Sequence, residues 1–350
     1  MKRDSNLLLL CILFVVLLGL GGVVSDGLFL SSFNLQSMAT QVPEIGLLAI
    51  GVMLVMCTGN GGIDLSGIAN ANLSGVASGI FALSFFDAYQ QPLLFTATFA
   101  VGCMAVGLFG GLLNGLIISR FSITPILCTL GTQMLFTGVA VVLSNGRSVT
   151  IGTPDYLSAI GNGFVLGVPI SFLLFVLTGL ILGFFLKFTR YGVRLMLMGA
   201  NPKAALYSGF QSARIITTTY AISGLLAGFA GLIIAARNIN VKWDYGSSYL
   251  LVAILIVVMA GVRPEGGYGR VVNVVLSAIV LQLLSSLLSF IGLSNFVRDL
   301  AWGVLLLCFL AVARFDLLNM IVASLPLKRT LTLPSDHQMR VFMENKNNED

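Results

Sequence analysis

The run LLLLCILFVVLLGLGGVV, from Leu7 to Val24, contains no charged side chain. A helix needs about 20 predominantly apolar residues to cross the hydrocarbon core of a bilayer, so this run predicts a membrane-spanning helix. Lys2 and Arg3 precede it, as basic residues precede the core of a cleaved secretory signal. Since the run is long for a signal core and no clear small-x-small cleavage site follows it, we interpret it as a retained first span.

The composition extends this interpretation to the whole chain. Of 350 residues, 57% are hydrophobic and 9% are charged, whereas a soluble domain is about 45–50% apolar and about 25% charged. So few charges would leave the surface of a soluble fold largely apolar, but a surface that faces lipid has no need of them. The 39 glycines also fit, because glycine is more frequent in membrane helices than in soluble ones.

Further apolar runs follow along the chain and give ten predicted spans. They lie near 7–24, 42–57, 67–86, 93–118, 122–143, 164–187, 214–236, 248–262, 271–291 and 296–314. The second and eighth are short, and the stretch between the second and third is rich in glycine and asparagine, which predicts irregular backbone there. The fold class is therefore an all-α membrane protein of about ten transmembrane helices.

The basic residues predict the orientation. With both termini in the cytoplasm, all of the 19 lysines and arginines lie on the cytoplasmic side except Arg147, Arg237, Lys242 and Arg298. Cytoplasmic segments of membrane proteins carry an excess of lysine and arginine, so this orientation and an even number of spans are expected. Because these charges are scattered over loops rather than gathered on one face, a nucleic-acid partner is not expected.

The chain divides into a transmembrane domain, residues 1–325, and a polar cytoplasmic tail, residues 326–350. The longest cytoplasmic loop of the transmembrane domain covers residues 188–213. Spans 2–5 and spans 7–10 enter the membrane from opposite sides, which is the arrangement of the inverted-topology repeats found in transporters. We therefore expect such a repeat.

The segment TGNGGIDLSG, from Thr58 to Gly67, carries an acidic residue, Asp64, between two apolar runs. A carboxylate at membrane depth is costly and marks a functional site by default, and the glycines permit a broken helix beside a water-filled cavity. The alternative is that Asp64 caps the third span at the cytoplasmic surface, with Ser66 assisting. As candidates for a translocation path or gate we take Gly61, Gly62, Asp64, Ser66, Asn72 and Asn114. For the asparagines, hydrogen bonding between helices is the alternative.

Two further features have structural interpretations. Glu44 follows Pro43 and is expected in the first turn of the second span, where the helix dipole favours a carboxylate. Glycines recur every four residues in three rows, so we expect each row to face another helix with backbones in close approach: Gly107, Gly111 and Gly115, then Gly179 and Gly183, and then Gly224 and Gly228.

The long cytoplasmic loop contains GANPKAALYSG, from Gly199 to Gly209. Proline suits the first position of a helix, so a short helix is expected to open at Pro202 and to end near Ser208 and Gly209. Its small side chains suit a groove of a partner protein, and an ordinary surface helix is the alternative.

Motifs of several enzyme classes are missing from the sequence. It contains no Gly-Lys dipeptide and hence no phosphate-binding loop, so the chain is not expected to hydrolyse ATP by that route. H-E-x-x-H and G-x-S-x-G are absent as well. The single histidine, His337, lies in the polar tail. We therefore expect a chain that is not an enzyme and that binds no metal or cofactor.

Five motifs, in order along the chain, resemble a known family. They are GGIDLS (61–66), TPILCTLGTQMLFTG (124–138) followed by Asn145-Gly146, GANPKAALYSGF (199–210), YAISGLLAGFAGLI (220–233) and EGGYGR (265–270). Together they resemble the permease subunits of ribose-, galactose- and xylose-type ABC importers, over nearly the whole chain from the second span to the tenth.

The resemblance implies a permease in the cytoplasmic (inner) membrane of a bacterium, which imports a sugar or sugar-like solute. It implies a second permease copy or paralogue, an extracytoplasmic solute-binding protein and a cytoplasmic ATP-binding subunit that uses ATP and Mg. The residues that would couple to the ATPase are Gly199, Asn201, Ala204, Ala205, Ser208 and Gly209. The resemblance also implies the direction of transport, import rather than export.

Other functions stay open at this point. Val262-Arg263-Pro264-Glu265 departs from the small-residue stretch usual in the family, which leaves the cargo open to autoinducer-2 or a nucleoside. An ion-coupled secondary transporter would show a paired acidic and basic site deep in the bundle, and Asp64 has no evident basic partner. An intramembrane enzyme would need a nucleophile with its base or a metal cluster, and the sequence shows neither.

Overall fold

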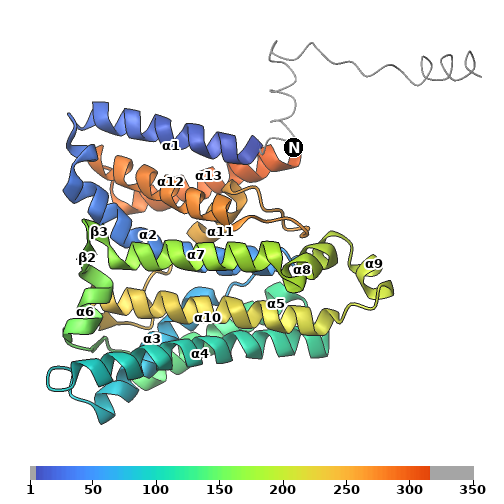
Figure 1. Cartoon of the computed structure of the whole chain (residues 1–350), viewed down its shortest axis with the longest axis horizontal. Coiled ribbons are helices and arrows are strands. Elements are labelled where there is room, and N and C mark those ends of the chain that lie inside the picture. The colour runs from blue at the N-terminus through green and yellow to red at the C-terminus, as the bar shows by residue number, and fades with distance from the viewer. Residues whose placement is uncertain (1–4, 316–350) are drawn as a thin grey trace, which may run out of the picture. The chain divides into compact units, whose positions relative to one another are not determined.

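The computed structural model describes residues 5–315 and is built almost entirely of helices (Figure 1). In chain order the elements are α1 Ser5–Val24, the 3-10 helix η1 Leu28–Leu30, α2 Ser32–Met56, α3 Gly67–Phe85, α4 Pro92–Phe121, α5 Pro125–Ser144, β1 Val149–Thr150, α6 Asp155–Asn162, β2 Phe164–Val165, β3 Val168–Pro169, α7 Ile170–Phe188, α8 Arg190–Ala200, α9 Pro202–Tyr207, α10 Ser212–Asn238, β4 Asn240–Val241, α11 Tyr249–Met259, α12 Val271–Phe290 and α13 Asn295–Phe315.

The long helices confirm the all-α membrane fold. Within the described residues, eight helices are long and apolar enough to span a membrane: α1, α2, α3, α4, α5, α7, α10 and α12. The two remaining predicted spans correspond to α11, a shorter apolar helix, and to α13. Of the described residues, 5–306 form one compact unit, called unit 1 below, and 307–315 belong to a second. The predicted polar tail, 326–350, lies outside the described residues.

Helices α10 and α4 pack against each other through rows of glycine, which has no side chain. The two glycine rows meet, since a Cβ on Gly107 or Gly111 would collide with backbone atoms of Gly224, Gly228 or Tyr220. This confirms the close approach expected from the glycine spacing. The backbone of α10 thereby lies at the centre of unit 1, with α2, α3 and α4 around it.

Helix α2 begins ten residues before the predicted start of the second span. Ser31 caps it, because its hydroxyl accepts a hydrogen bond from the backbone N–H of Asn34 at 3.3 Å. Pro43 therefore lies inside the helix, and Glu44 lies about three turns from its beginning. The expectation that Glu44 benefits from the helix dipole is wrong. The prediction failed because several residues before 42 are polar, so the hydropathy of that stretch does not indicate a membrane span.

The loops contain structure that apolar runs do not reveal. The cytoplasmic loop 188–213 holds two helices, α8 and α9, and α9 opens at Pro202 as predicted. At the opposite end of the bundle lie α6 and the antiparallel β2–β3 pair, where Phe164 faces Pro169, so α7 begins six residues later than predicted. Figure 1 places the start of α1 toward the end that carries α8 and α9, in agreement with a common side for the N-terminus and this loop.

Candidate functional site

The helical backbone breaks between α2 and α3, as the glycines predicted. After α2 ends at Met56, Gly59, Asn60 and Gly61 take positive φ angles of 77°, 53° and 67°, and α3 begins at Gly67. Glycine adopts this left-handed region without strain. Non-helical backbone at membrane depth is tolerated where it is covered by protein or lines a cavity. Here it turns the chain so that Asp64 points into the bundle.

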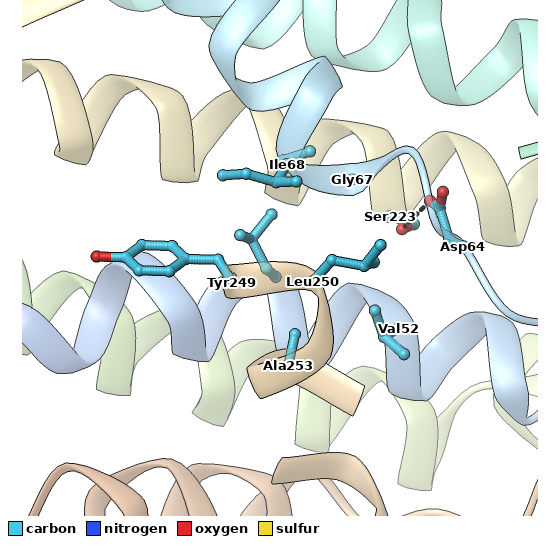
Figure 2. Close-up of a pocket in the computed structure, with 10 residues that line it drawn as sticks. Val52, Asp64, Gly67, Ile68, Ser223, Tyr249, Leu250 and Ala253 are labelled. Atoms are coloured by element: carbon cyan, nitrogen blue, oxygen red, sulfur yellow. Dashed lines mark hydrogen bonds between the residues drawn. The ribbon is translucent and has the colours of Figure 1, made fainter. Parts of the chain in front are cut away.

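The carboxylate of Asp64 is buried and fully engaged by hydroxyl and amide donors. Its exposed fraction is 2%. Its Oδ1 accepts from the Ser66 hydroxyl at 2.7 Å and from the Ser66 backbone N–H at 3.0 Å, and its Oδ2 accepts from the Ser223 hydroxyl at 2.9 Å. Figure 2 shows Asp64 and Ser223 joined across the gap between the broken segment and α10. The cap alternative fails, because Asp64 is not at a surface and no side chain caps the first turn of α3.

Asn114 of α4 extends this network. Its Nδ2 donates to the Ser66 hydroxyl at 2.7 Å. The structure thus brings together three of the predicted residues, Asp64, Ser66 and Asn114, and adds Ser223 of α10. Sequence reasoning missed Ser223, because it lies 159 residues from Asp64 in the chain. Gly51 of α2 leaves the room for it, since a Cβ there would lie 2.9 Å from the Ser223 hydroxyl.

The other three candidates have different places. Asn72 is apart from the network: its Nδ2 donates to the backbone carbonyls of Trp243 and Tyr245 at 3.2 and 2.9 Å, so it fixes the segment before α11. Gly62 is a packing residue, since a Cβ on it would lie 2.6 Å from the Thr58 hydroxyl. Gly61 has open space around it, and its positive φ is what the turn requires.

A cavity of about 10 Å³ lies beside the Asp64 network, which is about the space of one water molecule. Its lining residues come from α2, the start of α3, α10 and α11: Leu48, Val52, Asp64, Gly67, Ile68, Ser223, Ala227, Tyr249, Leu250 and Ala253. Figure 2 shows how the apolar side chains of Val52, Ile68 and Leu250 fill the space next to the carboxylate. Anything larger than a water molecule can pass this point only if these helices separate.

A second buried polar cluster surrounds Glu44. This carboxylate is 0% exposed and forms an ion pair with Arg237 of α10, with Oε1 and Nε 2.7 Å apart. Its Oε2 accepts from the hydroxyls of Tyr245 and Tyr249 at 3.0 and 3.1 Å. The cluster joins α2, α10 and the start of α11, and Tyr249 also lines the small cavity. Sequence reasoning missed it, because Arg237 was assigned to an outer loop.

The predicted coupling segment forms a capped, partly apolar projection. The side chain of Asn201 accepts from the Ala204 N–H at 3.0 Å, and the Ser208 hydroxyl donates to the Ala204 carbonyl at 2.9 Å. Ala205 is only 4% exposed, so the interpretation of its small side chain as part of an outward docking face is wrong. The large exposed apolar side chains are Leu206 and Tyr207, at 66% and 91%, and the small side chain of Ala204 is exposed as well.

This projection touches the broken segment backbone to backbone. Gly199, near the end of α8, lies against Cys57 so closely that a Cβ would collide with the Cys57 carbonyl. The same carbonyl accepts from the N–H of Gly267 at 3.2 Å. A Cβ on Gly59 would lie 2.9 Å from the Gly199 carbonyl oxygen. The α8–α9 element is therefore packed directly on the segment that holds Asp64.

Comparison with known proteins matches this chain to transport permeases. The model of the family described as "Branched-chain amino acid transport system / permease component" matches residues 34–312. The ribose import permease protein RbsC of Bacillus subtilis is 33% identical over 284 residues, 80% of this chain and 84% of that protein. RbsC of Haemophilus influenzae is 26% identical over 300 residues, 85% of this chain and 89% of that protein. The autoinducer 2 import system permease protein LsrD of Escherichia coli K12 is 29% identical over 268 residues, 75% of this chain and 78% of that protein. No solved structure matches the chain.

Proposed function

The chain belongs to the family of branched-chain amino acid transport system permease components, and from that premise we propose that it is the multi-pass membrane subunit of an ABC importer for a sugar or sugar-like solute. Two of its relatives are named for ribose import and one for autoinducer-2 import. Ribose-type sugars are the leading cargo, because the 33% identity to a ribose permease extends over 80% of the chain. Autoinducer-2 is the second candidate.

The observation that carries the mechanism is the packing of α8–α9 on the broken segment. A cytoplasmic ATPase that docks on Leu206 and Tyr207 would move a short capped helix, and a rigid element transmits displacement that a floppy loop would absorb. The contact between Gly199 and Cys57 passes this movement to the backbone on either side of Asp64. The bonds from Asp64 to Ser223 of α10, and from Ser66 to Asn114 of α4, would then exchange as the helices separate.

The proposal includes partners that complete the importer. These are a cytoplasmic ATP-binding subunit that uses ATP and Mg, an extracytoplasmic solute-binding protein, and a second permease copy or a paralogue. The chain itself would bind no cofactor. Apolar side chains as exposed as Leu206 and Tyr207, beyond the last turn of a membrane span, suit a protein partner on the cytoplasmic side.

Co-purification of the tagged chain in mild detergent tests this proposal. We expect an ATPase subunit with vanadate-sensitive activity in the eluate, and we expect Leu206→Asp combined with Tyr207→Asp to release it. The matched control is Leu166→Asp, since Leu166 is fully exposed on the β2–β3 turn at the other end of the bundle. Equal recovery of the ATPase from both variants would contradict the docking assignment.

A separate outcome would overturn the proposed class. The Glu44–Arg237 pair joins a buried carboxylate to an arginine in the last turn of α10, and an ion-coupled transporter also uses acidic and basic pairs. If the chain purifies without any ATPase and still moves solute into liposomes under an ion gradient, ion-coupled transport replaces the ATP-driven importer. Family membership favours the importer, in which this ion pair would stabilise the packing of α2 against α10.

A further inference from the structure

A second cavity, of about 300 Å³, lies between α2, α12 and the start of α13. Its volume is at the lower end of the range of about 300–1,000 Å³ that small-molecule sites occupy. The end of α2 meets Gly199 of α8 at Cys57, so the first turns of α2, which line this cavity, lie at the opposite end of the bundle. In the predicted orientation, this is the extracytoplasmic half of the membrane.

Two polar helix faces meet at this cavity. Its polar lining on α2 is Asn34, Ser37 and Gln41, and on α12 it is Gln282, Ser285, Ser286 and Ser289. Residues three, four and seven apart lie on one face of a helix, so each set forms a single polar stripe. Both helices count among the membrane spans. Polar stripes in a span face protein or water rather than lipid, and here they face each other across the cavity.

The stripes are held together by long hydrogen bonds. The amide of Gln282 donates to Gln41 Oε1 at 3.2 Å, and the Ser286 hydroxyl donates to Asn34 Oδ1 at 3.3 Å. These distances are at or beyond the upper end of ordinary hydrogen bonds. A ligand with several hydroxyl groups can therefore replace them with shorter ones. Side-chain amides and hydroxyls both donate and accept, as the hydroxyl groups of a sugar do.

The residues that line this cavity indicate the chemical class of its ligand. Among the described residues, the lining contains no Asp, Glu or His, and its one charged side chain is Arg298, which donates to the Ser289 hydroxyl at 2.9 Å. A zwitterionic amino acid would leave its ammonium group without a carboxylate partner here. Met38 and Phe290 add apolar surface suited to the C–H face of a sugar ring. We propose that this cavity is a receiving site for a neutral, polyhydroxylated solute on its way from the extracytoplasmic side, an inference that rests on the proposed importer function.

Cysteine protection in the complete transporter tests the inference. In intact cells, Ser285→Cys is labelled with a membrane-impermeant thiol reagent in the presence of D-ribose, D-galactose, D-xylose or L-leucine. The matched control is Ser84→Cys, because Ser84 is exposed near the end of α3 and outside the cavity. The unsubstituted chain gives the background from the natural cysteines. We expect at least one sugar to slow labelling of Ser285→Cys about tenfold at saturation, with no effect of leucine and no effect on Ser84→Cys.

Uptake is measured separately, so that the two proposals can fail independently. Absence of ATP-dependent sugar uptake by the unsubstituted transporter would count against the proposed function. Sugar uptake without sugar protection of Ser285→Cys would overturn the cavity inference alone, and so would protection by leucine in place of a sugar. As a second variant, Gln282→Leu is expected to weaken the apparent affinity for the sugar about tenfold, the equivalent of about 1.4 kcal/mol. Unchanged affinity in a variant that reaches the membrane and retains its ATPase would also overturn the inference.

Discussion

The buried ion pair between Glu44 and Arg237 offers the sharpest test of the packing. Replacing Arg237 by Gln leaves a carboxylate that is 0% exposed with only the hydroxyls of Tyr245 and Tyr249. Removal of one partner of a buried pair costs about 3–5 kcal/mol. Because the Arg237 side chain is 21% exposed, part of this interaction is screened, so we expect a loss of about 3 kcal/mol.

The reverse substitution and the double variant isolate the pair. Glu44→Gln leaves a guanidinium that water can still reach, so a smaller loss of about 1–2 kcal/mol is expected. In the double variant no uncompensated charge remains, and its loss should fall short of the summed single losses by about 2 kcal/mol. Arg147→Gln, an exposed arginine outside the cluster, should stay within about 0.5 kcal/mol of the unsubstituted chain.

The assay is unfolding in mixed micelles of increasing sodium dodecyl sulfate content, followed by tryptophan fluorescence. Trp243 lies two residues before Tyr245, and the second tryptophan of the sequence, Trp302, lies on α13. Two results would refute the reasoning: an Arg237→Gln variant as stable as Arg147→Gln, or single losses that add in the double variant. Either would mean that the charges are solvated and that tyrosine packing alone joins α2 to α10.

Two further predictions concern the path from the ATPase to Asp64. Asp64→Asn replaces one of the two accepting oxygens by an amide donor, so the serine hydroxyl that donated to that oxygen loses its acceptor, and uptake should fall at least about tenfold in membranes with normal amounts of the chain; normal uptake rates would remove Asp64 from the path. Gly199→Ala forces Cys57 away from α8, so uptake per ATP hydrolysed should fall while the ATPase still co-purifies. A transport-to-hydrolysis ratio equal to that of the unsubstituted transporter would show that this contact does not transmit the movement.

Patterns of residues that lie close together in sequence were sufficient to predict the helical framework of this protein. Apolar runs located the ten long or apolar helices, the glycines of 58–66 located the break, and Asn201-Pro202 located the start of α9, because each depends on residues close together in sequence. Asp64, Ser66 and Asn114, three of the six candidates for a path or gate, lie together in the structure, and their role in a path stays a prediction. Asp64 was recognisable as a charge in an apolar context, with Ser66 in the same segment, and Asn114 was recognisable as a polar residue on an apolar span.

What failed depended on partners distant in the chain. Hydropathy placed the start of the second span at residue 42, because Asn34, Ser37 and Gln41 are polar, and only the stripe on α12 makes them tolerable in a span. Glu44 and Arg237 each had a plausible separate interpretation, as a residue favoured by the helix dipole and as a loop cation. Their pairing appears only when α2 and α10 are packed together. Asn72 was grouped with the gate because its residue type does not reveal which loop it holds.

The small void beside Asp64 also has an electrical consequence. Ions cross a protein along a continuous chain of water molecules. The space of about 10 Å³ between aliphatic side chains has room for a single water molecule, so such a chain is interrupted there. In this arrangement the interior beside Asp64 acts as an insulator, although a carboxylate lies at its edge. A chain held in this arrangement should therefore not conduct ions past Asp64.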